Sequence, residues 1–243
     1  VLDVDGSSLY YTVNGKGIPI VFIHPPVLTC ANFKYQVEEL SKEFQVITFD
    51  IRGHGRSQYS RQPLTYPLIA RDIKHLLNHL KIEKAFICGY STGGSIALEY
   101  LLNSADRSLG GIVISGMSEV REKHLKKKIS LGISLASKKA VPVLALSISW
   151  SNSNTRELFI NIEQYYRYSL QYNCTQQLGK IKLPVLLVYG EDDKPFYDYA
   201  MLLHKKIPYA QLKFINHTKH QIPTKAANDL NEMIRQFIKD AFQ

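Results

Sequence analysis

The sequence predicts an α/β fold in which helices flank a mostly parallel eight-stranded sheet and a helical cap is inserted into the chain. Apolar runs of strand length alternate with longer amphipathic stretches, as expected for a parallel sheet covered on both faces. A hairpin signature opens the chain, and the alternation stops between residues 118 and 179, where only helical patterns occur. Together these observations favour one α/β core with one insertion.

Six apolar runs predict the parallel strands of this sheet. They cover residues 20–23, 45–50, 84–88, 111–115, 184–189 and 211–215. Helical patterns lie between and after them, at residues 32–42, 67–80, 92–102 and 225–241. Thr65 is the predicted N-cap of the second helix, because its hydroxyl can accept a backbone hydrogen bond there. The opening VLDVDGSSLYYTV predicts two antiparallel strands about an Asp5-Gly6 turn, which completes the eight.

The stretch from 118 to 179 is the predicted insertion. Its helix-like pieces cover residues 119–136, 141–150 and 155–173. An insertion that follows the fourth parallel strand lies over the carboxyl edge of the sheet, where open α/β folds bind ligands. We therefore expect a core of residues 1–117 and 180–243 and a cap of residues 118–179.

Composition narrows the class of protein. Hydrophobic residues make up 45% of the 243 and charged residues 21%, which is typical of a soluble globular chain. Membrane insertion is not expected, because no apolar run reaches about 18 residues. No secretory signal is visible in the first eleven residues. Cys30, Cys88 and Cys174 match no zinc or redox spacing, so we interpret them as small hydrophobes in a cytoplasmic protein.

Positive charge is concentrated in one part of the insertion. The formal net charge is +9, and the stretch from Arg121 to Lys139 holds seven Lys or Arg against one acid. A nucleic-acid partner is not expected, because no nucleic-acid-binding motif accompanies this stretch. Two interpretations stay open: a solvated face of a cap helix, or a surface that docks on anionic surfaces or attracts anionic substrates.

The stretch Gly89-Tyr90-Ser91-Thr92-Gly93 matches G-x-S-x-G between an apolar strand and an apolar helix. In that setting the motif forms a tight turn that exposes a nucleophilic serine. A side chain at Gly89 or Gly93 is expected to clash with the neighbouring backbone. The helix that begins at Thr92 is expected to direct its first N–H groups at an oxyanion. We therefore predict that Ser91 is a nucleophile rather than a turn residue.

A serine nucleophile needs a base, and the base needs an acid to orient it. His217 and His220 follow the last strand, at the sheet edge where Ser91 also lies. Asp192 and Asp193 follow the preceding strand, and one of the two is expected to be only a solvated turn residue. The order Ser, Asp, His occurs in a known hydrolase architecture. Since H-x-x-H without further ligands is weak evidence for a metal, we expect neither a metal nor a cofactor.

These residues resemble the α/β-hydrolase superfamily, and the resemblance covers almost the whole chain. FDIRGHGRS (49–57) looks like the family's D-x-R-G-x-G-x-S loop. YGEDDKP looks like its acid turn, which selects Asp193, and the loop after the last strand looks like its histidine loop, which favours His220. The insertion 118–179 corresponds to the family's helical cap.

One departure from the family affects the oxyanion hole. The family usually has His-Gly-x after the first parallel strand, with a backbone N–H that completes the hole, whereas this chain has His24-Pro25-Pro26-Val27. Proline has no N–H. We therefore expect Val27 N–H to act beside Thr92 N–H. The candidate substrate-pocket residues are His24, Tyr90, Tyr165 and Tyr168.

The resemblance implies a serine hydrolase that acts on an ester, thioester, lactone or similar small acyl substrate through an acyl-enzyme. Ser91 would be the nucleophile, His220 the base and Asp193 the acid that orients it. Two alternatives stay open. One is a C–C bond hydrolase or a cofactor-free oxygenase-type enzyme on the same triad. The other is a weakly catalytic, ligand-sensing regulator, which the proline pair and the basic stretch suggest. Substrate identity and oligomeric state do not follow from the sequence.

Overall fold

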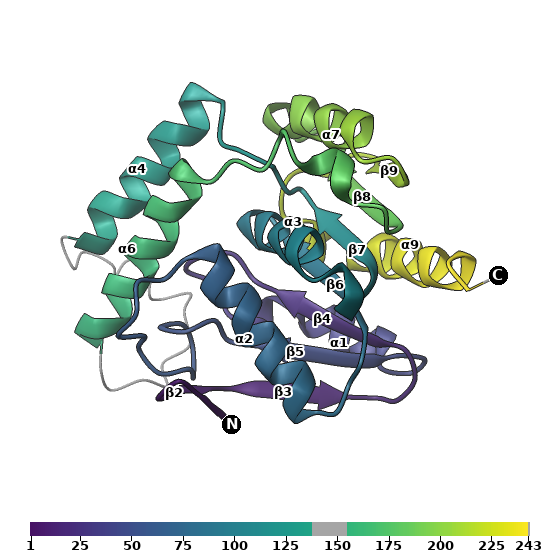
Figure 1. Ribbon diagram of the computed structural model, residues 1–243. Helices are drawn as coiled ribbons and strands as arrows, with labels where there is room; N and C mark the ends of the chain where they lie inside the picture. The colour runs from purple at the N-terminus through teal and green to yellow at the C-terminus, as the bar shows by residue number, and fades with distance from the viewer. Residues whose placement is uncertain (138–154, 243) are drawn as a thin grey trace.

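The computed structural model describes residues 1–137 and 155–242, and its centre is a mostly parallel sheet (Figure 1). The strands of this sheet are β3 (Tyr11–Asn14), β4 (Pro19–Ile23), β5 (Gln45–Phe49), β6 (Ala85–Tyr90), β7 (Ser108–Ile114), β8 (Val185–Gly190) and β9 (Ala210–Ile215). Their order is β3-β5-β4-β6-β7-β8-β9, and only β3 runs antiparallel to its neighbour among these seven. All six predicted parallel strands are confirmed.

The prediction of eight strands in one sheet is wrong for the described residues, where the main sheet has seven. The opening hairpin exists, with β1 (Leu2–Val4) paired to β2 (Ser7–Leu9) about a turn whose residues Asp5 and Gly6 have φ of 51° and 74°. It forms a separate two-stranded sheet, because Gln58 takes the outer hydrogen bonds of Ser8. The antiparallel edge strand is β3 instead, which follows the hairpin.

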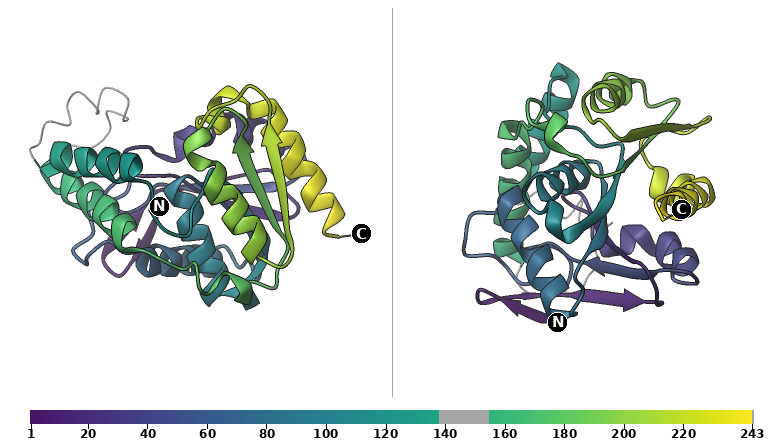
Figure 2. Two further views of the ribbon diagram at one scale, coloured as in Figure 1. Left: turned by 90° about the horizontal axis from the view of Figure 1, so that it is seen from above. Right: turned by 45° about the vertical axis from the view of Figure 1, so that its right-hand side comes forward.

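Helices cover both faces of the sheet, and alternate residues of each strand point to opposite faces. Ile20 and Phe22 of β4 pack in the core under α1 (Lys34–Leu40) and α9 (Ala227–Asp240). Val21 and Ile23 pack in the core that includes residues of α2 (Tyr66–His79) and α3 (Thr92–Asn103). Figure 2 shows the two helical layers on either side of the strands. Central strand β6 is buried at every residue, as a strand covered on both faces should be.

Further helices lie between or after these strands. They are η1 (Cys30–Phe33), η2 (Ala105–Arg107), η3 (Leu178–Lys180), α7 (Lys194–Lys206) and α8 (Ile222–Lys225). The predicted N-cap of α2 is confirmed, since Thr65 Oγ1 accepts a hydrogen bond of 3.2 Å from Leu68 N–H. The predicted last helix, residues 225–241, corresponds to α9, and the short helix α8 precedes it.

The insertion between β7 and β8 contains α4 (Lys123–Ser137) and α6 (Thr155–Gln171), which pack together (Figure 1). The predicted helix at 141–150 lies outside the described residues. The two ends of the insertion meet at one neck. There Cys174 N–H donates to Ser118 O at 3.0 Å, and the hydroxyls of Ser118 and Thr175 lie 2.7 Å apart. Residues about sixty apart therefore leave and re-enter the core side by side.

The structure can be compared with the predictions on the cysteines and on membrane insertion. Cys30, Cys88 and Cys174 are all free thiols, and the last two are buried. Among the helices described, none has both the length and the apolar character needed to cross a membrane. The cytoplasmic location stays a prediction.

Candidate active site

Ser91 lies in a sharp turn between β6 and α3. Its backbone has φ 55° and ψ −122°, a conformation that residues other than glycine rarely adopt. The turn is anchored to the next strand, because Ser91 N–H donates to Ile114 O at 2.8 Å. The side chain makes no capping bond to α3, so its hydroxyl is free to meet a partner from another element. Strain of this kind gathers at functional sites.

Two glycines make this turn sterically feasible, as the sequence predicted. A Cβ on Gly89 would lie 2.1 Å from Gly93 O, and a Cβ on Gly93 would lie 2.2 Å from Ile23 O. Real Cβ atoms do not approach backbone oxygens this closely. The expected clash is confirmed at both positions, and the first turn of α3 therefore packs directly on the end of β4.

His220 joins two groups that are far apart in the sequence. It lies in the loop after β9, where its Nδ1 is 2.8 Å from Asp193 Oδ2 and its Nε2 is 3.0 Å from Ser91 Oγ. A carboxylate can only accept a hydrogen bond, so Nδ1 carries the proton and donates the hydrogen bond to Asp193. Nε2 is then the acceptor for the Ser91 hydroxyl. This tautomer leaves the imidazole ready to remove a proton from Ser91.

Asp193 rather than Asp192 reaches the histidine. Asp193 follows β8 at the start of α7, and it is only 8% exposed. Asp192 is exposed to solvent, and its backbone N–H donates to Thr218 O at 3.0 Å. The geometry therefore agrees with the choice that the resemblance favoured and assigns Asp192 to the turn.

His217, the other candidate base, is not part of this arrangement. It is exposed and has φ 52° in the turn that follows β9. Its described hydrogen bond is a backbone one, from its N–H to Glu191 Oε2 at 3.4 Å. The loop thus directs one of its two imidazoles toward Ser91 and the other toward solvent.

Two aromatic rings enclose the imidazole of His220. The ring of Phe196, from α7, has its centroid 4.3 Å from that of His220, and the Tyr90 ring lies 5.4 Å away. Burial, and then the charge of Asp193, raises the pKa of Tyr90 well above its usual range, so its phenol stays neutral. Both rings pack against the imidazole, whose side chain remains 30% exposed. Sequence analysis gave no role to Phe196, although it directly follows the quoted acid turn.

The loop after β4 holds Val27 in an unusual conformation. Val27 has φ 72°, which is costly for a β-branched residue, and it is 9% exposed. Within the described part of the chain, no group accepts a hydrogen bond from the backbone N–H of Val27 or of Thr92. Neither N–H is therefore occupied by another described group, and the role of the two as oxyanion donors stays a prediction. Thr92 N–H also lies at the positive end of the α3 dipole.

His24, predicted to line a pocket, is instead part of the internal framework. It is 0% exposed, its Nδ1 lies 2.8 Å from Pro25 O, and its Nε2 accepts from Ile51 N–H at 2.9 Å. Burial lowers the pKa of His24, which keeps the ring neutral. With both nitrogens bound to backbone, its polar atoms cannot meet a substrate.

The tyrosines predicted for the pocket also pack internally. Tyr90 is 5% exposed under His220, and Tyr165 on α6 is 0% exposed. Tyr168 packs its ring 5.0 Å from that of Tyr66 on α2. Tyr165 and Tyr168 pack α6 against the core, and Tyr90 packs against His220, so the structure favours the packing interpretation over a pocket lining.

The D-x-R-G-x-G-x-S loop supports the site without touching Ser91. Asp50 accepts from the backbone N–H of Cys30 at 2.8 Å and of Arg56 at 2.9 Å, which ties two loops together. Arg52 forms a fully buried bidentate ion pair with Asp72 of α2, at 2.6 and 2.7 Å. The sequence motif pointed to this loop but gave no sign of its ion pair.

The lysines of the basic stretch that the structure describes lie on the exposed side of α4. Lys123, Lys126, Lys127 and Lys128 are exposed, whereas Ile129 on the same helix is 5% exposed and packs inward. This is the arrangement expected of a solvated helix face. Docking on an anionic surface stays a prediction.

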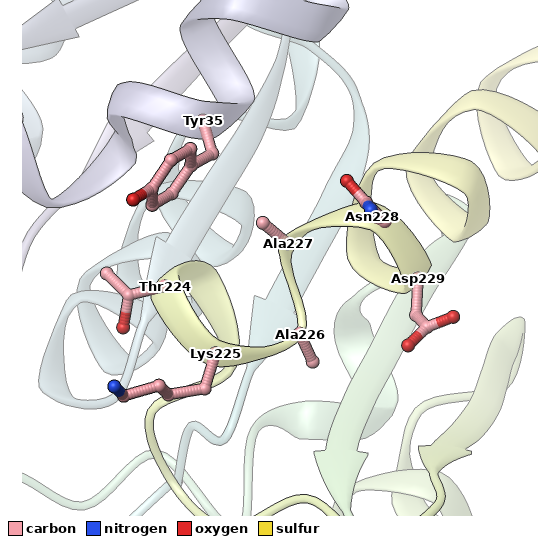
Figure 3. A pocket seen from close by; sticks show the side chains of 7 residues that line it. All are labelled: Tyr35, Thr224, Lys225, Ala226, Ala227, Asn228 and Asp229. Atoms are coloured by element: carbon pink, nitrogen blue, oxygen red, sulfur yellow. The ribbon is translucent and has the colours of Figure 1, made fainter.

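One surface hollow lies apart from these residues. Figure 3 shows it between α1 and the α8–α9 junction, with Tyr35, Lys225 and Asp229 among its lining residues. Its volume is about 290 Å³. None of Ser91, Asp193 and His220 lines it. We therefore do not assign it as the place where a substrate meets Ser91.

Comparison with known proteins identifies the family. The profile described as alpha/beta hydrolase fold matches residues 18–160, more than half of the chain. The protein belongs to the α/β-hydrolase family, and the sheet order and the turn at Ser91 agree with that assignment.

Relatives that match nearly the whole chain are hydrolases by name. The AB hydrolase superfamily protein YisY of Bacillus subtilis is 26% identical, with 95% of each chain covered. The putative carbamate hydrolase RutD of Azorhizobium caulinodans is 25% identical, also with 95% of each chain covered. A solved structure, Est816 as an N-acyl homoserine lactone degrading enzyme, has a TM-score of 0.77 and 26% identity over 97% of this chain and 98% of its own. The chain is accordingly an α/β-hydrolase-family hydrolase.

Proposed function

We propose that this protein is a serine hydrolase that cleaves a small ester, thioester or lactone through an acyl-enzyme. One observation carries the proposal: the His220 imidazole lies between Ser91 Oγ, 3.0 Å from Nε2, and Asp193 Oδ2, 2.8 Å from Nδ1. A serine hydroxyl is a weak nucleophile until a positioned base removes its proton. A buried carboxylate on the far nitrogen fixes the tautomer that this base needs.

The chemistry proceeds in two halves. Ser91 Oγ attacks the acyl carbon while Nε2 of His220 takes the hydroxyl proton, and Asp193 stabilises the imidazolium that forms. The backbone N–H groups of Thr92 and Val27 bind the oxyanion of the tetrahedral intermediate. His220 then gives its proton to the leaving alcohol or thiol. Water, deprotonated by His220, attacks the acyl-enzyme, and the acid product leaves with Ser91 restored.

We also propose that residues 118–179 form a cap that covers the site. The neck at Ser118 and Thr175 supports this division, because the insertion leaves and returns at one point of the core. Tyr165 of α6 supports it as well, since its hydroxyl donates to His24 O, beside the loop that holds Val27. A cap placed over the carboxyl edge of the sheet would shape the acyl pocket.

Lactones are one class of candidate substrate. Est816, described as degrading N-acyl homoserine lactones, is 26% identical to this chain over nearly its whole length. A lactone is an internal ester, so the same serine attack would open its ring. The resulting hydroxyl would stay on the acyl group rather than leave as a separate alcohol.

A fluorophosphonate probe tests the nucleophile. We expect the wild-type protein to be labelled on Ser91 and to hydrolyse p-nitrophenyl esters of graded chain length, with a homoserine lactone assayed beside them. Ser91→Ala should lose the label and at least about 10³-fold in kcat, because no other group can take the place of the nucleophile. The exposed Ser130→Ala on α4 is the matched control and should keep both properties.

The same probe separates the proposal from its alternatives. A folded wild-type protein that is not labelled would contradict an activated serine and support a ligand-sensing role. A labelled protein that cleaves no ester, thioester or lactone would instead direct attention to C–C bond hydrolysis or cofactor-free oxygen chemistry on the same residues.

A further inference from the structure

The hydroxyl of Tyr165 connects the two segments that carry the proposed oxyanion donors. Tyr165 lies on α6 of the insertion, and its Oη donates to the carbonyl oxygen of His24 at 3.1 Å. The Thr92 hydroxyl donates to the same Oη in a longer contact of 3.4 Å. Thr92 directly follows Ser91, and His24 begins the loop that leads to Val27. One phenol thus joins the start of α3 to the loop after β4.

We propose that Tyr165 is a positioning residue that fixes the separation of the Thr92 and Val27 backbone N–H groups, and this inference rests on the proposed serine hydrolase function. Tyr165 does not touch the reacting atoms. It acts through the backbone of the two segments that it joins, and it makes the oxyanion hole depend on the docking of α6.

The loop from His24 to Val27 needs anchors from outside because it contains two prolines. Pro25 and Pro26 have no N–H and cannot donate backbone hydrogen bonds. The loop is instead held by its carbonyls: His24 O accepts from Tyr165, and Pro25 O accepts from His24 Nδ1 at 2.8 Å. The Tyr165 bond is the one of these two that comes from another element.

Val27 makes such anchoring necessary. Its φ of 72° is unfavourable for a β-branched side chain and persists only where the surroundings enforce it. If the His24 end of the loop relaxes, the Val27 backbone can return toward ordinary φ values, and its N–H then turns away. Buried among Tyr66 and His54, the Tyr165 ring has little freedom, so its hydroxyl is a rigid anchor.

Misplaced oxyanion donors reduce the rate more than they reduce substrate binding. They act on charge that develops in the transition state, where a displacement of about 1 Å can cost about 10²-fold. The carbonyl oxygen of the bound substrate, which carries less charge, forms weaker hydrogen bonds with these donors. Loss of the Tyr165 hydroxyl should therefore lower kcat while leaving KM nearly unchanged.

The test is Tyr165→Phe, which removes one oxygen and keeps the ring that packs on Tyr66. We expect kcat for the best p-nitrophenyl ester to fall by between about 10-fold and 10²-fold, with KM within about twofold of wild type. An arylboronic acid, which forms a tetrahedral adduct with Ser91, should bind more weakly by a factor similar to the loss in kcat. The midpoint of the kcat–pH profile should not move, because His220 and Asp193 are untouched.

Tyr168→Phe is the matched control. Tyr168 lies three residues further along α6 and packs its ring on Tyr66, and no hydrogen bond from its hydroxyl occurs among the described residues. We expect its kcat and boronic acid affinity to stay within about twofold of wild type. Equal losses in both variants would overturn the inference and assign the effect to the packing of α6.

Thr92→Val gives a second route if Tyr165→Phe folds poorly. It removes the Thr92 hydroxyl but keeps the backbone N–H, so kcat should fall by a smaller factor. In the double variant the two losses should not multiply, because each breaks the same connection. Independent effects would count against the inference.

The outcomes also separate this inference from the proposed function. A wild-type protein that fluorophosphonate does not label would remove both. A labelled and active wild-type protein whose Tyr165→Phe variant matches it in kcat and boronic acid affinity would overturn only the positioning role.

Discussion

At the scale of single residues, the site depends on a backbone conformation that only its neighbours can enforce. Ser91 has φ 55°, and the space for it exists because Gly89 and Gly93 carry no side chains. A Cβ on Gly93 would lie 2.2 Å from the backbone oxygen of Ile23, a residue of β4 that pairs with Gly89 of β6. The nucleophile and the start of the Val27 loop are therefore held together by backbone-to-backbone packing.

Gly93→Ala tests this packing. Alanine gains up to about 1 kcal/mol over glycine in helix propensity, but overpacking against fixed backbone costs about 1–3 kcal/mol. The clash should win, so we expect a lower free energy of unfolding in urea and a fall in kcat as α3 shifts away from β4. Gly179→Ala is the control, because its Cβ would have nothing closer than Lys206 O at 3.9 Å. A Gly93→Ala protein as stable and active as wild type would contradict the argument.

Sequence motifs predicted the residues that form the central hydrogen-bonded chain, Ser91, His220 and Asp193. They could do so because each motif ties a residue type to a strand end, and parallel strands place those ends at one edge. Residues that act through packing belong to no such motif, so the sequence did not identify them. Phe196 covers the His220 ring, yet its position after the acid turn is also that of an ordinary helix residue.

At the scale of elements, α6 is docked on the core by three polar side chains that contact backbone. Asn161 bonds both the N–H and the carbonyl of Ser60, at 2.7 and 3.2 Å. Gln164 Oε1 accepts from Leu64 N–H at 3.1 Å, and Tyr165 reaches His24 O. Their spacing of i, i+3 and i+4 puts all three on one helix face. These contacts fix the helix that we propose as part of the cap.

Asn161→Ala should loosen this docking. Asn161 is 0% exposed, so its removal leaves the Ser60 N–H without an acceptor, at a cost of about 1–3 kcal/mol. We expect faster hydrogen exchange of the α6 amides in residues 159–171 and a lower kcat, with exchange in β6 unchanged. Asn103→Ala is a matched control, since Asn103 is an exposed helix residue whose side chain, among the described residues, bonds Glu99 of its own helix. Unchanged exchange in α6 would show that the Asn161 contacts are not needed to hold it.

At the edge of the sheet, the sequence predicted the hairpin but not which strand joins the sheet. The Asp5-Gly6 turn correctly predicted a hairpin, because both residues accept positive φ. Which short strand joins the sheet depends on competing partners. Gln58 bonds Ser8, and β3 pairs with β5 over four residues. Such long-range competition has no local pattern, so the sequence assigned both hairpin strands to the sheet.

At the scale of the whole molecule, buried neutral imidazoles lie at the junction of the core and the insertion. The rings of His24 and His54 lie 5.3 Å apart, and that of His54 lies 5.7 Å from the ring of Tyr165. His54 Nδ1 donates to Arg52 O at 3.0 Å, while its Nε2 is buried without a partner among the described residues. Burial, helped by the nearby His24, lowers the pKa of His54 from 6.5 to about 3. The sequence placed these residues in loops and could not show that the loops are covered.

This burial predicts that the fold weakens in mild acid. Between pH 6.5 and about 3 the unfolded chain binds a proton at His54 that the folded chain excludes, so stability is complete above this window and falls as pH drops through it. At about 1.4 kcal/mol per pH unit, His54 alone removes about 2 kcal/mol by pH 5, and His24 adds in the same direction. Urea unfolding at pH 7.5 and pH 5 measures the difference.

His54→Asn, whose amide can still donate to Arg52 O, should show a smaller loss of unfolding free energy between the two pH values, whereas the exposed His204→Asn should lose as much as wild type. If all three proteins lose the same free energy of unfolding between the two pH values, acid destabilises the protein through other groups. The stability of the core–insertion junction would then not depend on the ionisation of these rings.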